Sequence, residues 1–64
     1  MTTAQESTFA ILVSLSVVSE IEFFDSDGVL VALRPNGVDR VFISPNGESQ
    51  IEVPGVGLID VVLP

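Results

Sequence analysis

Residues 29–48 read VLVALRPNGVDRVFISPNGE, two short apolar runs that are each followed by Pro-Asn-Gly. The first triplet is Pro35-Asn36-Gly37, and the second is Pro45-Asn46-Gly47. Proline fixes φ near the value that the first position of a tight turn requires, asparagine tolerates the second position, and glycine adopts the left-handed conformation of the third. The stretch therefore predicts two successive β-hairpins, which together form a β-meander.

Asp25-Ser26-Asp27-Gly28 has the form of a third turn of the same kind. If each turn is a three-residue loop with its glycine in a bulge position, strand pairing follows by counting outward from the turns. The pairs predicted in this way are Asp25 with Val29, Phe23 with Val31 and Ile21 with Leu33 in the first hairpin; Arg34 with Val38, Val31 with Val41 and Val29 with Ile43 in the second; and Ser44 with Glu48, Val41 with Ile51 and Arg40 with Glu52 in the third.

This register sorts the side chains of the meander onto two faces. One face is apolar and holds Ile21, Phe23, Val29, Val31, Leu33, Val41, Ile43, Ile51 and Val53. The other holds charged and polar residues, with Phe24, Leu30 and Phe42 adjacent to one another among them. A slip of one residue would move a whole strand to the opposite face, so one consistent apolar face supports the register. On the charged face we expect Arg40 to pair with Glu52, and Arg34 with Glu20.

Two apolar runs flank the meander. Thr8 to Val18 alternates with period two and is rich in β-branched residues, which favours a strand, and Leu58 to Leu63 is interrupted only by Asp60. Both runs are apolar on nearly both faces, as is typical of strands covered on both sides. Residues 1–7 are small and polar and predict a flexible or partner-ordered N-terminal arm. The sequence thus predicts one small all-β domain over residues 8–64, an antiparallel barrel or sandwich of about six strands with a central β-meander.

Charge excludes several classes of partner. The chain carries nine acidic residues against two arginines and no lysine, for a net charge of −7. Such a chain repels the phosphates of nucleic acids and the headgroups of anionic membranes. No basic residue precedes the apolar run that begins at Thr8, so we expect no secretory signal peptide. That run is also shorter than the roughly 20 apolar residues of a transmembrane helix, which predicts a soluble protein.

The residue inventory argues against catalysis. The chain has no histidine, lysine or cysteine to activate a serine or threonine nucleophile, so we expect no enzyme and no small-molecule substrate. Without histidine and cysteine it also lacks the usual ligands of transition metals, and we expect no cofactor.

Asp25 and Asp27 are weak candidates for a metal site. Their turn is similar in composition to the start of a calcium-binding loop, where alternating carboxylates point inward. Position 12 of such a loop requires a glutamate, but counting from Asp25 this position holds Asn36. We therefore expect an acidic turn without a bound ion.

The composition favours self-association. Hydrophobic residues make up 47% of the chain and charged residues 17%, which is apolar for a 64-residue domain that is mostly surface. Small domains usually need disulfides, a metal or partner subunits, and only the last remains here. We therefore expect a non-enzymatic, homo-oligomeric structural protein that assembles with itself or with other structural proteins. A virion component, such as a phage capsid decoration or tail protein, is the setting in which tiny lysine-free β proteins of this kind occur.

The residues expected at the interface are the large apolar side chains of the two end runs and of the cluster on the charged face: Phe24, Leu30, Phe42, Leu12, Val13, Leu15, Ile59, Val61 and Leu63. The alternative is a small acidic inhibitor or adaptor that binds a host protein through its charged face or through an open strand edge. The mass in solution separates the two hypotheses.

Overall fold

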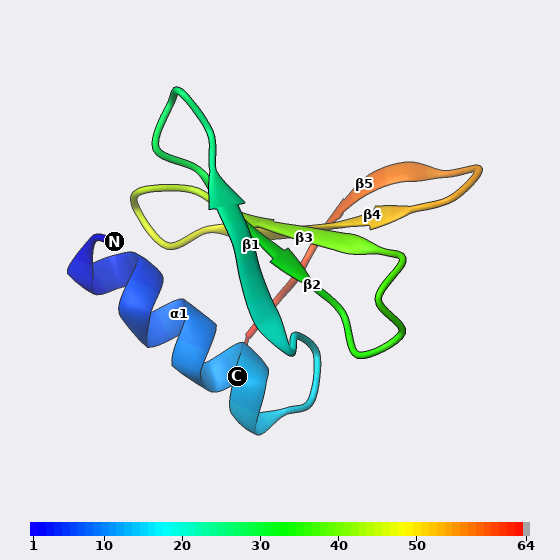
Figure 1. Ribbon diagram of the computed structural model, residues 1–64, viewed down its shortest axis with the longest axis horizontal. Coiled ribbons are helices and arrows are strands. Elements are labelled where there is room, and N and C mark those ends of the chain that lie inside the picture. Colours follow the sequence, from blue (N-terminus) through cyan, green and yellow to red (C-terminus); the bar gives the residue numbers. More distant parts are fainter. Residues whose placement is uncertain (64) are drawn as a thin grey trace.

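The computed structural model describes residues 1–63 and consists of one helix followed by five strands (Figure 1). The elements are α1 (Thr3–Ser14), β1 (Glu20–Phe24), β2 (Leu30–Leu33), β3 (Arg40–Ile43), β4 (Ser49–Val53) and β5 (Gly57–Asp60). The strands form one antiparallel sheet in the order β1-β2-β3-β4-β5. The predicted meander is therefore confirmed, and the fold is mostly β. Among the described residues the sheet is not closed, with β1 and β5 as its edges, so the predicted barrel or sandwich is not confirmed.

The first element is a helix and not the strand predicted for Thr8 to Val18. Thr2 is its N-cap: the Thr2 side chain accepts a hydrogen bond from the Gln5 amide at 3.0 Å, and Gln5 Oε1 accepts one from the Thr2 amide at 2.9 Å. This capping box satisfies two backbone donors that a helix start leaves unpaired. Residues 3–7, predicted to form an arm, are instead the first turns of α1.

The helix ends in a Schellman motif. The Val17 amide donates to the Leu12 carbonyl at 2.8 Å, and the Ser16 amide donates to the Val13 carbonyl at 3.0 Å. Ser16 has a φ of +59°, the left-handed conformation that usually selects glycine at this position. Of the residues that the structure covers, none belongs to a helix that is both long and apolar enough to cross a lipid bilayer.

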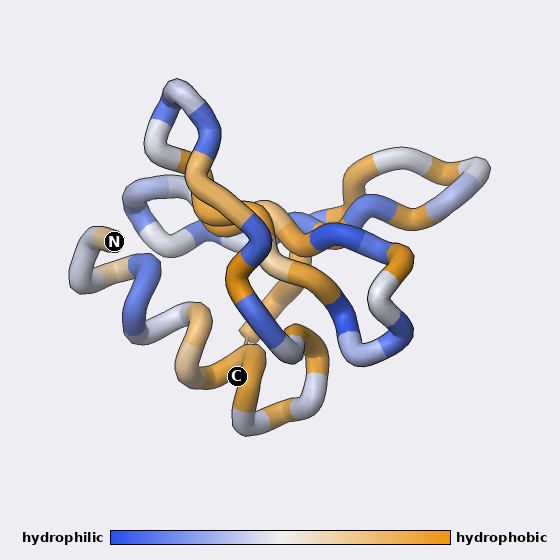
Figure 2. Tube along the Cα trace, viewed as in Figure 1, coloured by the Kyte–Doolittle hydropathy of each residue, from blue (hydrophilic) through white to orange (hydrophobic). Residues whose placement is uncertain are grey.

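The core lies between α1 and one face of the sheet. The fully or almost fully buried hydrophobic residues of this cluster are Leu12, Val18, Leu30, Ala32, Val41 and Ile43. In Figure 2 the C-terminal half of α1 and the middle of the sheet are among the hydrophobic parts of the trace, and hydrophilic residues gather in the loop between β1 and β2. A helix brings residues three or four positions apart onto one side, which lets Thr8 and Leu12 face the sheet together.

The register is confirmed in two places and shifted in two others. Phe23 pairs with Val31 and Val41 pairs with Ile51, as predicted. Near the start of β1 a bulge between Ile21 and Phe23 moves Ile21 from its predicted partner Leu33 to Ala32. In the second hairpin the partner of Val41 is Ala32 and not Val31, a slip of one residue.

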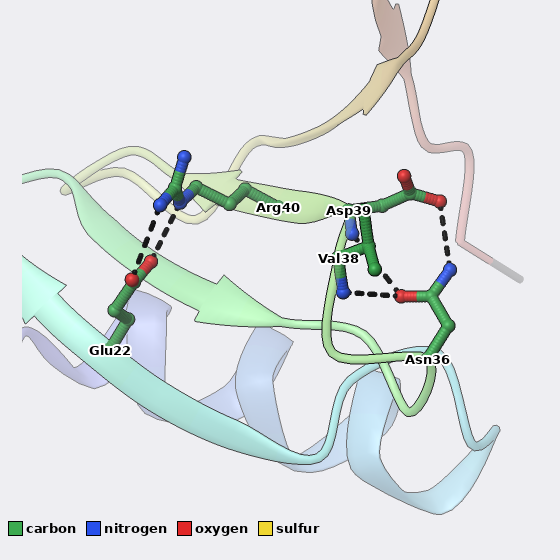
Figure 3. Close-up of polar contacts among 5 residues, drawn as sticks. All are labelled: Glu22, Asn36, Val38, Asp39 and Arg40. Atoms are coloured by element: carbon green, nitrogen blue, oxygen red, sulfur yellow. Dashed lines mark hydrogen bonds and ion pairs between the residues drawn. The ribbon is translucent and has the colours of Figure 1, made fainter.

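The second hairpin slips because its loop contains four residues. The Arg34 amide donates to the Asp39 carbonyl at 3.1 Å, so the loop spans residues 35–38. Asn36 Oδ1 accepts hydrogen bonds from the amides of Val38 and Asp39 at 2.9 and 3.2 Å, and Asn36 Nδ2 donates to the Asp39 carboxylate at 3.0 Å (Figure 3). The third hairpin, with the same Pro-Asn-Gly triplet, closes on a Ser44–Glu48 backbone bond and keeps the three-residue loop.

Candidate functional site

The N-terminal half of α1 binds two of the three turns. Gln5 Nε2 donates to the carbonyls of Gly28 at 2.7 Å and Ile43 at 3.1 Å. Thr8 Oγ1 donates to the Gly47 carbonyl at 2.7 Å. Gln5 and Thr8 are themselves buried, so these hydrogen bonds satisfy polar groups that would otherwise lie beneath the helix without a partner. Their role is to hold the helix on the sheet.

Gly47 lies directly beneath the helix. A Cβ at this position would sit 3.1 Å from Thr8 Oγ1 and 3.2 Å from the Ala4 Cβ, and the φ of Gly47 is +92°. Both the close approach and the backbone conformation require glycine here. The third turn thus has a packing role in addition to reversing the chain.

Asp25 organises the first turn. Its Oδ1 accepts hydrogen bonds from the amides of Asp27 at 2.8 Å and Val29 at 2.9 Å, which is an Asx turn. Asp25 and Asp27 are both exposed, and within residues 1–63 no group of three or more acidic side chains could hold a metal ion together. The carboxylate of Asp25 has a structural role that accounts for its presence.

A cleft of about 360 Å³ lies beside the start of β4 and the end of β5. It is lined by Gly47, Glu48, Ser49, Asp60, Val61 and Leu63. Asp60 accepts a hydrogen bond from Gln50 Nε2 at 3.0 Å, whereas the buried hydroxyl of Ser49 has no hydrogen-bond partner among the described residues. The lining includes the carboxylates of Glu48 and Asp60 and no histidine, lysine or cysteine.

The face of the sheet away from α1 carries an ion pair between non-adjacent strands. Arg40 Nε on β3 lies 2.8 Å from Glu22 Oε2 on β1, and the pair passes over β2 (Figure 3). The hydrogen bond from Arg40 lowers the pKa of Glu22, and the same contact raises the pKa of Arg40. The direct ion-pair partner of Arg40 is therefore Glu22 and not the expected Glu52, which contributes a weaker electrostatic attraction that also raises the pKa of Arg40.

Glu22 lies at the bulge in β1. Its side chain lies on the same face as Arg40, within reach of the guanidinium. The other predicted pair, Arg34 with Glu20, is also wrong, because Arg34 Nη1 lies 3.7 Å from Asp39 Oδ2 at the base of its own loop.

The predicted cluster of Phe24, Leu30 and Phe42 does not form. Leu30 pairs with Ile43 in the shifted register and is fully buried beneath α1. Phe42 pairs with Val31, on the opposite face, where it is half-buried. Phe24 pairs with Leu30 at the edge of the sheet and is 45% exposed. The added loop residue has moved Phe42 to the opposite face, whereas Phe24 and Leu30 remain cross-strand neighbours.

The other predicted interface residues fall into two groups. Leu12 is fully buried in the core, so like Leu30 it has no surface left for a partner. Val61 and Leu63 are half-buried against the same core. Val13, Leu15 and Ile59 are exposed by 44%, 52% and 46%. These three, together with Phe24, remain available to a partner.

Both edge strands expose large apolar side chains. Every residue of β1 and of β5 is exposed. On β1 these include Ile21 and Phe23, and on β5 they include Leu58 and Ile59. The sequence did not predict an exposed apolar surface on β1, because the predicted register placed Ile21 and Phe23 in the core. The meander itself indicates open edges, because its first and last strands each have one unpaired side unless another strand is added there.

The chain was compared with models of protein families, with curated proteins and with solved structures, and no match was found in any of the three.

Proposed function

We propose that this chain is a non-enzymatic subunit that associates with copies of itself to build a structural assembly. The observation that carries the proposal is the open sheet, whose two edge strands both expose large apolar side chains. Unpaired edges with apolar side chains template pairing with another chain, and natural monomers blunt them. Lysine on the edge is one common way of blunting, and this chain has no lysine.

The helix supports the same proposal. The C-terminal half of α1 carries apolar side chains beyond the side that packs on the sheet. Ile11, Val13 and Leu15 are exposed by 38%, 44% and 52%. A helix that is hydrophobic around its circumference is typically covered on more than one side. A second subunit is the cover that we propose, consistent with what exposed apolar patches usually mark.

The assembly that we propose is a structural one, and the setting that we propose for it is a virus particle, with the chain as a capsid decoration or tail component. Its partners are copies of the chain or other structural proteins of the same assembly. The acidic surface contributes solubility and keeps unrelated acidic surfaces apart.

Sedimentation velocity over a range of micromolar concentrations tests the proposal. We expect a mass that is a multiple of the 6.8 kDa monomer and that falls on dilution. Phe23→Asp places a charge on β1 and Leu58→Asp places one on β5, and we expect at least one of the two variants to reduce association. Val38→Asp is the matched control. Val38 is 74% exposed in a loop, so the substitution adds the same charge away from either edge.

A monomer at every concentration would overturn the proposal. It is the result expected from the alternative, a small acidic inhibitor or adaptor that binds an unrelated protein. Equal weakening by the edge variants and by Val38→Asp would point to net charge, and not to the edges, as the cause, and would likewise count against it.

A further inference from the structure

We infer that the edge of β5 is the contact between copies, and that two copies pair antiparallel about Ile59 to make one continuous sheet. The inference rests on the proposed function, since it names the surface through which the chain self-associates. It is carried by the backbone of β5, by the absence of a bulge there, and by the distribution of charge.

The hydrogen bonds of β4 fix which groups of β5 face outward. The Val61 amide donates to the Ser49 carbonyl at 2.9 Å, so the backbone of Val61 faces β4. Backbone groups alternate in direction along an antiparallel strand, so Ile59 also faces β4. Leu58 and Asp60 therefore direct their N–H and C=O groups to the open side, where the sheet ends.

The edge of β5 is the better of the two edges for strand addition. β1 is interrupted by its bulge and carries Glu20 and Glu22, and both devices disfavour edge pairing. β5 keeps an unbroken register from Val53–Gly57 to Gln50–Asp60. In Figure 1 the β4–β5 hairpin extends away from α1, which leaves its outer edge uncovered.

Charge selects a second copy as the occupant. The chain has eleven charged residues and a net charge of −7. Only one of these residues, Asp60, lies within residues 53–63. A chain of this charge repels its own copy, and the repulsion is least where the acids are fewest. The carboxylate of Asp60 is moreover hydrogen-bonded to Gln50 within its own subunit.

The register follows from the position of Asp60. A two-fold axis at Asp60 would place two carboxylates directly opposite each other, which is destabilising. An axis at Ile59 places Leu58 opposite Asp60 of the other copy, so that the outward-facing groups of both residues bond in narrow pairs. Ile59, which is 46% exposed, then faces its own copy on the side of the sheet that carries the core.

Single cysteines test this register cleanly because the chain has no cysteine of its own. In the proposed pairing Ile59 meets its copy as a non-hydrogen-bonded pair, with Cα atoms about 4.5 Å apart, which is within disulfide range. We expect Ile59→Cys to form a covalent dimer under mild oxidation. Leu58→Cys is the matched control: its copy lies two residues away along the strand, beyond the roughly 7 Å that a disulfide spans. Val38→Cys measures random collision at an exposed loop.

A second measurement does not depend on a side chain. The chain is short enough for chemical synthesis, and N-methylation of the Leu58 amide removes an outward donor without altering the side chain. By symmetry the dimer loses two hydrogen bonds, so we expect association to weaken by about tenfold or more.

The outcomes separate this inference from the proposed function. Preferential cross-linking of Ile59→Cys, with weakened association of the N-methylated chain, supports the inference. If the unmodified chain associates but Ile59→Cys links no better than Val38→Cys, or Val61→Cys links better, pairing about Ile59 is wrong while self-association stands. If the unmodified chain is a monomer throughout, both are overturned.

Discussion

Arg40 on β3 and Glu22 on β1 form an ion pair across the strand that separates them, with 2.8 Å between Arg40 Nε and Glu22 Oε2 (Figure 3). The carboxylate lies at the bulge in β1, and the arginine lowers its pKa. The pair is partly exposed, with side-chain exposures of 47% for Arg40 and 29% for Glu22, so its contribution to stability is screened by solvent. It links the edge strand to the middle of the sheet.

The ion pair predicts a pH dependence that Glu22→Gln removes. A carboxyl group with a lowered pKa in the folded state stabilises the fold above its unfolded pKa, about 4.3, and loses this effect as the pH falls through the folded value. We therefore expect Glu22→Gln to be less stable than the parent at pH 7 in urea denaturation, with the difference vanishing near pH ~2. Glu20→Gln, on the same strand and with no ion-pair partner among residues 1–63, is the control. A loss of equal size at both pH values would assign the effect to something other than charge.

Gly47 and Gly37 separate backbone strain from steric contact. Both have positive φ, but a Cβ at Gly37 meets nothing within 4 Å, whereas at Gly47 it meets Thr8 and Ala4 beneath the helix. We expect Gly37→Ala to lower the free energy of unfolding by about 1 kcal/mol through strain alone. Gly47→Ala should cost about 2–3 kcal/mol, because overpacking adds to the strain. Chemical denaturation measures the loss of stability in both variants. Equal losses would mean that the helix shifts to make room for the added methyl group at no cost in free energy.

Ser16 is a site for stabilisation. It occupies the left-handed position of the Schellman motif with a φ of +59°. Glycine adopts this conformation freely, so we expect Ser16→Gly to raise the free energy of unfolding by about 1 kcal/mol. Ser16→Ala keeps a Cβ and is expected to give no gain. If both variants gain equally in thermal denaturation, the serine hydroxyl and not the backbone was the source of the cost.

Gln5 is expected to be essential for docking the helix. Its amide group donates to the carbonyls of Gly28 and Ile43 beneath α1. Gln5→Leu removes both of these hydrogen bonds, and we expect it to lower the free energy of unfolding by about 2–3 kcal/mol. Ser7→Leu, an exposed position on the same helix, controls for the added apolar side chain. A similar stability for the two variants would show that water replaces the Gln5 bonds.

The meander was predictable because its signals are local. The type of each turn depends on three or four neighbouring residues, and the glycines at positions 28, 37 and 47 all adopt the positive φ that the turn chemistry requires. The loop length of the second hairpin was not predictable from its Pro-Asn-Gly triplet. It depends on the side chain of Asp39, which follows the triplet and bonds to Asn36.

The helix was missed because two signals compete in the same residues. The β-branched, alternating run after Thr8 favours a strand, but Thr2 and Gln5 have the spacing of a capping box, which marks a helix start. Giving weight to that spacing would have corrected the assignment. Tertiary contacts also stabilise the helix over a strand, since Thr8 and Gln5 form hydrogen bonds with turns that lie far along the chain.

The candidate interface was predicted only in part, for the same reason. Phe24, Val13, Leu15 and Ile59 are exposed as a partner surface requires, whereas Leu12 and Leu30 are buried between the sheet and the helix that the sequence did not predict. Once a helix replaces the first strand, the sheet loses a neighbour and its edges are left open. An error in one element thus changed which residues are available to a partner.

The contacts between α1 and the turns also set an order for folding. Each strand pairs with the next one along the chain, but the bonds from Gln5 and Thr8 span 23, 38 and 39 residues. α1 is therefore made before any of the carbonyls that it binds. Because one of its hydrogen bonds is to Gly47, α1 cannot complete its docking before the third turn is available, and until then its apolar side is exposed to aggregation. The first element of the chain is thus held in place by contacts with turns that are made after it.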